Sequence, residues 1–331
     1  MPDAASPSAP TLALLGPQAK QPNVRETAQQ LGMLHGDRPV AVITSGWEER
    51  EREEDELFDH LGVPALNLGL WSRTERVFLE DPELFAALRQ RHDSARRLRR
   101  LYRRRLDHAD AAVRDLLQPR RPGSEDEFRV LEILERGDDD LLAEVVSEAL
   151  DDIRRIDAAH LSRVDDLRAA FEDEWRPGER PAMAREREAV AERVEQCSGV
   201  LIAGGHVAVL LNRLRLFAMS KLLPGRPVVA WSAGAMVLTE RIVLFHDSPP
   251  HGFGLPEVFE TGLALAKDVV ALPGAATRLL LDDQARVTRL ARRMEPAHCL
   301  PLDAGEAALF HDGVELTAPR SLCVDGTVSA A

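Results

Sequence analysis

A serine stands between an apolar run and a run of small residues in the segment VVAWSAGAMVL, residues 228–238. The β-branched residues before Ser232 are typical of a buried strand, and those after it suit a helix. A serine on such a sharp turn is lifted toward a cleft, as in the nucleophile elbow of serine hydrolases. The pattern G-x-S-x-G is met except at its first glycine, which is Ala230. The alternative is a small residue where two elements pack.

Two glycines follow the preceding apolar run, GVLIA at 199–203. Consecutive strands of an α/β sheet often lie side by side, and their carboxyl ends form the edge where ligands bind. The backbone N–H groups of Gly205 and Ala233 would then be suited to hold an oxyanion, since glycine permits close approach. The alternative is a glycine turn needed only for packing a helix on a strand.

The elements that position these residues follow α/β order. Strands are predicted at 11–15, 39–43, 63–68, 199–203 and 227–231, with a helix at 207–216 and a solvated helix from Trp47 to Gly62. Further strands are predicted at 241–245, 268–272, 298–302 and 307–310, with a terminal hairpin turn at 311–313. The Pro-rich and Ser-rich start, residues 1–10, is predicted to be a disordered tail.

The character changes over residues 73–194, which we predict to be an all-helical insertion into an α/β domain formed by 11–72 and 195–331. Apolar residues at helical spacing, from Leu141 to Phe171, suit the inner face of a helical hairpin. The segment 89–105 carries nine arginines. It suggests either a site for nucleic acid or a solvated face paired with the acidic helices beside it, and the many acidic residues of the insertion favour pairing.

Composition excludes several classes of protein. The 331 residues carry a formal charge of -13, which argues against nucleic acid or an anionic membrane as a partner. No apolar run is long enough for a membrane span, and the three cysteines lack metal-ligand spacing, so we expect reduced thiols in a cytoplasmic protein. No motif for a metal or a nucleotide cofactor is present, so neither is expected.

Four segments of the sequence are together similar to those of a known family. LIAGGHVAVLLNRL, PVVAWSAGAMVL, the early VAVITSG and the late CLPLDAGEAALF together resemble peptidase family S51, which includes aspartyl dipeptidases and cyanophycinases. The resemblance covers residues 10–72 and 195–331. It implies a doubly wound, mostly parallel, flavodoxin-like sheet of the class I glutamine amidotransferase type. It also implies that Ser232 is the nucleophile, that Gly205 and Ala233 are the oxyanion donors, and that Asp247 is the acidic partner. For Asp247 the alternative is a solvated turn residue.

The histidine of the family is missing from its expected place. The His-Phe of the family falls on 272–275, which reads LPGA and contains no base. Because a serine hydroxyl is a poor nucleophile without a base, another histidine must substitute or hydrolysis is lost. His206 follows the glycine pair and is the first candidate, and His246 and His251 are the others. Asp303 falls on a late aspartate of the family, with Glu306 displaced by two from the family's glutamate.

Two hypotheses follow from these residues. The first is an S51-like serine hydrolase or peptidase that attacks a small peptide amide through Ser232. The second is a catalytically inactive relative that binds a ligand, or that contacts a protein partner or a second copy of itself through the helical insertion. A fold of this kind hosts many functions, so fold alone does not choose between them.

Overall fold

A seven-stranded sheet forms the centre of the computed structural model, which describes residues 10–117, 139–245 and 254–330. Its strand order is β11-β10-β1-β5-β4-β2-β3. The five strands from β1 to β3 in that order are parallel, whereas β10 is antiparallel to β1 and β11 to β10. The strands are β1 (Leu12–Leu15), β2 (Val40–Ile43), β3 (Ala65–Asn67), β4 (Val200–Ile202), β5 (Val228–Trp231), β10 (Ala307–His311) and β11 (Val314–Thr317).

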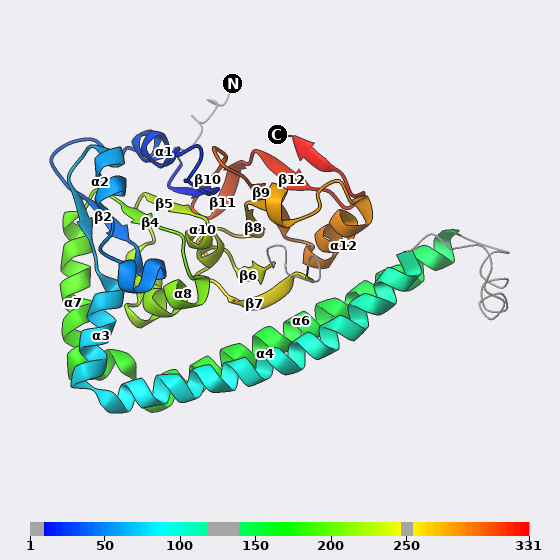
Figure 1. Ribbon diagram of the computed structural model, residues 1–331, viewed down its shortest axis with the longest axis horizontal. Coiled ribbons are helices and arrows are strands. Elements are labelled where there is room, and N and C mark those ends of the chain that lie inside the picture. The colour runs from blue at the N-terminus through cyan, green and yellow to red at the C-terminus, as the bar shows by residue number, and fades with distance from the viewer. Residues whose placement is uncertain (1–9, 118–138, 246–253, 331) are drawn as a thin grey trace, which may run out of the picture.

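Helices cover both faces of this sheet (Figure 1). Successive residues of β1 enter different cores: Leu12 and Leu14 pack on one side, Ala13 and Leu15 on the other. Both faces are therefore apolar, which gives the central strands continuous hydrophobic runs rather than alternation. One side is covered by α1 (Val24–Gln30) and α2 (Asp55–Leu61), and the other by α3 (Leu70–Glu80), α7 (Pro181–Gln196), α8 (Val207–Leu216), α9 (Met219–Leu222) and α10 (Ala233–Leu238).

A smaller sheet lies beside the main one, in the order β13-β12-β9-β8. It contains β8 (Val269–Pro273) and β9 (His298–Leu302), which are parallel, and β12 (Arg320–Leu322) and β13 (Val328–Ala330). A hairpin of β6 (Arg241–Leu244) and β7 (Glu257–Thr261) stands between this sheet and the long helices. The remaining helices are α11 (Ala275–Arg278) and α12 (Gln284–Met294), with short 3₁₀ turns η1 (Ser45–Arg50) and η2 (Pro177–Glu179).

Two long helices, α4 (Pro82–Leu117) and α6 (Asp139–Trp175), pack along each other and project beyond the sheets (Figure 1). Asp81 and Pro82 define where α4 begins: the Asp81 carboxylate accepts the Leu84 N–H at 3.1 Å, and Pro82 needs no hydrogen bond in the first turn. The seam between the two helices is apolar, with Tyr102, Leu106 and Ile153 buried in it. None of the described helices is long and apolar enough to cross a membrane.

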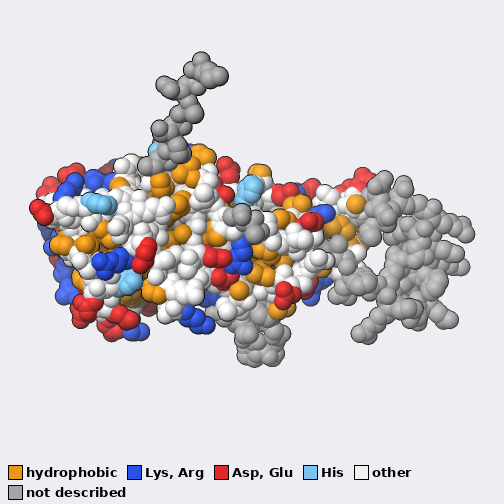
Figure 2. Space-filling view, turned by 90° about the horizontal axis from the view of Figure 1, so that it is seen from above, with side chains coloured by type: hydrophobic (Ala, Val, Ile, Leu, Met, Phe, Trp, Pro, Cys, Tyr) orange, Lys and Arg blue, Asp and Glu red, His pale blue; other side chains and the backbone are white. Residues whose placement is uncertain are grey.

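Most of the predicted strands form, and the fold class is confirmed as mixed α/β with a mostly parallel main sheet. The prediction does not distinguish the two sheets: the strands expected at 268–272 and 298–302 belong to the smaller one. The predicted insertion, 73–194, contains α4 and α6, most of α3, and most of α7, and both α3 and α7 pack on the main sheet. The predicted tail lies outside the described residues except for Pro10. Figure 2 shows acidic and basic side chains interspersed over one face of the molecule.

A buried ionic network joins the long helices to α12 and the β6–β7 hairpin. Arg293 of α12 donates two hydrogen bonds of 2.7 Å to the Asp157 carboxylate of α6. The Tyr102 hydroxyl of α4 donates to the same carboxylate at 2.8 Å and accepts from the Val258 N–H of β7 at 3.0 Å. Burial acts against the charge of Arg293, yet the Asp157 carboxylate raises the pKa of that guanidinium above its ordinary value. Four elements therefore meet at one satisfied charge pair.

Replacing Asp157 with asparagine should lower the free energy of unfolding by about 3 kcal/mol, because it leaves the Arg293 charge buried without a counter-charge. Asp152 provides the control: it lies on the same helix, its side chain is 59% exposed, and its partner is Arg155 of the same helix. Asp152→Asn should change stability by less than about 0.5 kcal/mol. Urea unfolding of both variants measures the difference. Equal effects would show that the network does not hold the helices in place.

Candidate functional site

The predicted elbow is present in the backbone at Ser232. The residue lies between β5 and α10 with φ 52° and ψ −122°, a conformation that non-glycine residues rarely adopt. Its N–H donates to the Leu15 carbonyl at 3.1 Å, and its carbonyl accepts from the Met236 N–H at 3.2 Å. Strain of this kind costs about 1–3 kcal/mol and persists only where the surroundings impose it. The two hydrogen bonds impose it here, and the side chain stays half-buried at the carboxyl edge of the sheet.

Glycines allow neighbouring strands to approach this turn. A Cβ atom on Gly204 would lie 2.7 Å from the Ser232 Cβ, and one on Gly234 would lie 2.3 Å from the Ile202 carbonyl oxygen. Since real Cβ atoms essentially never come so close, both positions require glycine. The loops after β4 and β5 are thus in backbone contact, as expected from the adjacency of the two strands.

The expected oxyanion donors lie at this contact. The Ala233 N atom is 3.5 Å from the position of a Cβ on Gly204, and Gly205 is the next residue. Gly205 has φ 113°, and its backbone rests against the Gly46 carbonyl after β2. Within the described part of the chain, neither the Gly205 N–H nor the Ala233 N–H donates to a backbone or side-chain acceptor. Two N–H groups without partners beside a serine can hold an anionic oxygen.

His206, the first candidate for the base, is used as a helix cap. Its Nδ1 accepts the Val209 N–H at 3.3 Å, and its own backbone N–H donates to the Gly46 carbonyl at 2.7 Å. When Nδ1 accepts, the neutral ring carries its proton on Nε2, so neither nitrogen has a lone pair for the serine proton. No hydrogen bond joins the Ser232 hydroxyl to an imidazole among the described residues. The structure places His206 beside the elbow loops without connecting it to Ser232.

The other predicted acids and bases are placed as follows. Asp247, His246 and His251 lie outside the described residues. Asp303 accepts the Ala276 N–H at 3.1 Å and pairs with Arg320, which also contacts Glu306 at 2.7 Å. The backbone of Asp303 packs against Gly16 after β1, so Asp303 lies at the same edge as the elbow.

The segment that replaces the family's His-Phe is the end of β8 and the start of α11. Leu272 and Ala275 have no exposed surface, and Gly274 adopts φ 69° between them. No side chain of 272–275 can accept a proton.

The prediction of one solvated helix from Trp47 to Gly62 is wrong. Only α2 is an α-helix there, ending at Gly62 as expected, and η1 replaces the rest. Glu51 is 1% exposed because its carboxylate accepts the Trp71 and Ser72 N–H groups, at 2.7 and 2.8 Å, where α3 begins. The charged residues around Glu51 predicted a solvated side chain. It is buried instead because its carboxylate accepts the N–H groups at the start of α3, which have no partner within that helix.

Glu48 is a residue that the sequence did not single out. It has φ 60° and ψ −124°, nearly the values of Ser232, and it lies within η1 after β2, whereas Ser232 directly follows β5. Glu48 stands within a run of charged residues, and no residue type in that run indicates a strained turn, so the sequence did not predict its conformation. With His206, it lines one end of a large cavity beside the elbow.

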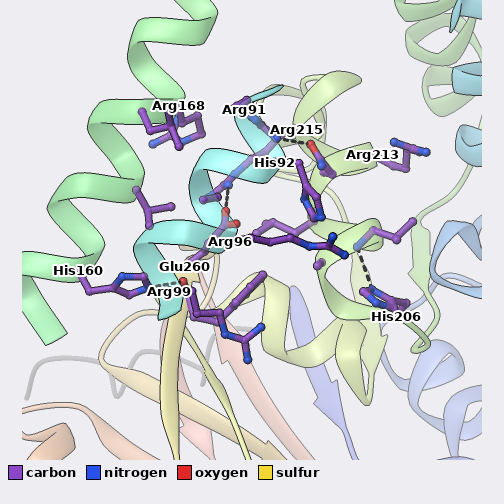
Figure 3. A pocket seen from close by; sticks show the side chains of 18 of the residues that line it. Arg91, His92, Arg96, Arg99, His160, Arg168, His206, Arg213, Arg215 and Glu260 are labelled. Atoms are coloured by element: carbon purple, nitrogen blue, oxygen red, sulfur yellow. Dashed lines mark hydrogen bonds and ion pairs between the residues drawn. The ribbon is translucent and has the colours of Figure 1, made fainter. Parts of the chain in front are cut away.

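This arginine cavity, as we call it, lies between α4, α6, α8 and β7 and has a volume of about 430 Å³ (Figure 3). Its arginines are Arg91, Arg96, Arg99, Arg168, Arg213 and Arg215. Three of them belong to the basic segment 89–105, which was predicted to pair with the neighbouring acidic helices. That prediction is wrong for Arg99 and Arg103, which both contact Glu257 of β7, at 2.9 and 2.5 Å. Packing places Arg99 and Arg103 beside the β6–β7 hairpin, so the carboxylate within their reach is Glu257.

Two further observations concern metal and thiol chemistry at this site and the similarity of the chain to known proteins. No group of three or more His, Cys, Asp or Glu side chains among the described residues is arranged to hold a metal ion. The three cysteines are free. Comparison of the chain with protein-family models and with curated proteins finds no match to either. Fold and site therefore define a mixed α/β protein with a strained serine at the carboxyl edge of a mostly parallel sheet, next to an arginine-lined cavity.

The strain at Ser232 predicts an unusual order of stability. Ser232→Gly should be more stable than Ser232→Ala by about 1 kcal/mol, because glycine adopts a positive φ without strain. Thermal unfolding measures the difference. The matched control is Ser162, exposed on α6, where Ser162→Ala should instead be more stable than Ser162→Gly by about 1 kcal/mol. The same order at both sites would show that the turn at Ser232 is unstrained.

Proposed function

We propose that this chain is an S51-like serine hydrolase with a class I glutamine amidotransferase-like fold, acting on an amide of a small peptide through Ser232. The strained backbone of Ser232 is the observation that supports this most. A residue serving only for packing at φ 52° would be expected to be glycine, since glycine avoids the strain. Retention of a serine there favours a role for its hydroxyl.

The surrounding groups suit acyl transfer. The Ser232 oxygen would attack the amide carbonyl carbon, and the developing oxyanion would accept from the Gly205 and Ala233 N–H groups. The amine would leave with a proton, and water would then release the acyl group from the serine. Both proton transfers need a base near Ser232. His206 can take this role only if its ring leaves the cap on α8, and Asp247 is its proposed acidic partner.

A second candidate function is ligand binding without catalysis by a relative that has lost its base. Two observations favour it: 272–275 offers no proton acceptor, and the Nδ1 of His206 is bound to the Val209 N–H. The N–H pair at the elbow would then hold an anionic group of a ligand. The outer face of the helical insertion, where Leu101 of α4 is 62% exposed, is the surface proposed for a protein partner or a second copy of the chain. A monomeric mass by light scattering at micromolar concentration would contradict self-association.

Labelling with a fluorophosphonate probe tests the hydrolase. The serine oxygen displaces fluoride from phosphorus, so mass spectrometry of the intact chain should show one adduct in the native protein and none in Ser232→Ala. His206→Ala should slow labelling by about 100-fold if this histidine is the base. His108→Ala, an exposed histidine on α4, serves as the matched control and should leave the rate unchanged.

The outcomes separate the two candidates. An unlabelled native chain, under conditions that label an S51 peptidase, contradicts the hydrolase and favours ligand binding. Labelling at Ser232 that is unaffected by His206→Ala keeps the hydrolase and assigns the base to another residue, with His246 and His251 to be substituted next.

A further inference from the structure

The arginine cavity concentrates positive charge in an acidic protein. Its lining contains six arginines but only two carboxylates, Glu48 and Glu260, whereas the whole chain carries a formal charge of -13. The arginines come from three separate helices: α6, α4 and α8 (Figure 3). A fold that merely spread its arginines over the surface would not gather them from segments more than a hundred residues apart.

Some of these cations are neutralised within the protein. Arg215 donates to Glu260 at 2.5 Å, Arg99 pairs with Glu257 at 2.9 Å, and Arg168 donates to Asp165 at 2.9 Å. These pairs account for half of the arginines in the lining. These ion pairs hold the side chains that form the walls of the cavity, and the three paired arginines add little net charge to it.

Two arginines of α4 have no carboxylate partner among the described residues. Arg91 donates to the neutral side chain of Asn212 at 2.7 Å and lies over the Phe171 ring. Arg96 is exposed at the cavity and has no hydrogen-bond or ion-pair partner in the described part of the chain. The cavity therefore carries two guanidinium groups that the protein itself does not neutralise.

Arg213 adds a donor that is buried without a partner. The residue is 8% exposed, its guanidinium lies over the Trp71 ring, and its Nε atom is buried without a hydrogen bond. Its nearest carboxylate, Glu75, is 3.5 Å away. Burial lowers the pKa of both Arg213 and Arg91, which means that their charges have lost water without gaining full compensation. An anion at Arg91 would restore what the water provided there.

Apolar side chains complete the lining. Val164, Leu167, Leu211 and Phe259 face the same cavity. A volume of about 430 Å³ falls in the range of pockets for small organic ligands. The ligand must therefore combine an anionic group with an organic part, which excludes a bare inorganic ion as the best fit.

We propose that the arginine cavity binds a small phosphate ester, its phosphoryl group at Arg91 and Arg96 and its organic part against the apolar residues. A phosphate monoester carries a charge of about −1.5 to −2 at neutral pH, which matches two unneutralised guanidinium groups. Guanidinium forks suit phosphoryl oxygens, and a tetrahedral group offers acceptors toward several helices at once, whereas a carboxylate offers one plane. This site goes beyond the proposed hydrolase, because its ligand needs no reaction at Ser232.

Calorimetric titration with phenyl phosphate tests the proposal. Native protein and Ser232→Ala should bind the probe equally, so this result is independent of whether Ser232 is a nucleophile. Arg96→Gln should weaken binding by about tenfold, the effect expected for one charge-assisted contact. Arg100→Gln is the matched control: Arg100 is exposed one turn further along α4 and does not line the cavity. It should change affinity by less than about twofold.

Three results would overturn the proposal. Equal weakening by Arg96→Gln and Arg100→Gln would mean attraction to the surface charge of α4 alone. Tighter binding of benzylsuccinate than of phenyl phosphate would assign the cavity to a dicarboxylate. Lack of binding at about 10 mM phenyl phosphate would exclude a phosphate ester site. Thermal unfolding of the variants checks that each retains the fold, as expected for exposed residues.

Discussion

The ends of three parallel strands approach one another more closely than any side chain would permit, and the site depends on this contact. Gly46 after β2 faces Gly204 and Gly205 after β4, Gly204 also faces Ser232, and Gly234 after β5 faces the end of β4 at Ile202. A methyl group at these positions would meet backbone atoms or the Ser232 Cβ at 2.3–2.7 Å. Because the backbones touch, the strained turn at Ser232 is held on both sides. The backbone nitrogen of Ala233 lies at the same contact, 3.5 Å from the position of a Cβ on Gly204.

The elbow and the arginine cavity share one boundary. His206 and Glu48 lie on the loops that make the close contact, and both also line the cavity. The cavity has its opposite wall on α4 and α6, whose position is fixed by the Tyr102, Asp157 and Arg293 network at some distance from the elbow. Two anchors therefore define the site. Backbone contact fixes the sheet edge, and a buried charge pair fixes the helices that face it.

Strain and unpaired charge identify functional regions here more clearly than motifs do. Ser232 and Glu48 are held in nearly the same unfavourable conformation in the segments after β5 and β2. Arg91 and Arg213 lose hydration on burial without full compensation of their charges. Each of these features costs free energy in the folded state. Their coincidence around one sheet edge is more simply explained by ligand binding there than by packing.

The sequence by itself determined the strands of the main sheet, α8 and the elbow, whereas β7, β12 and β13 were not predicted. Val228 to Trp231, the small residues around Ser232 and the pair Gly204-Gly205 carry local patterns, and local steric preferences act on neighbours in the chain. Those preferences also predicted the end of α2 at Gly62. The division of the strands between two sheets was not predicted, because pairing joins residues far apart in the chain.

Only the tertiary structure decided which polar groups meet. Arg99 pairs with Glu257 rather than with a neighbouring helix, Glu51 caps α3 from a separate loop, and His206 uses its ring as a cap. A charged side chain pairs with whichever partner the packing brings within reach, and the residues next to it in the sequence do not indicate that partner. The arginine cavity likewise combines α4, α6, α8 and β7, which only the packing brings together. No single segment of the sequence therefore predicts it.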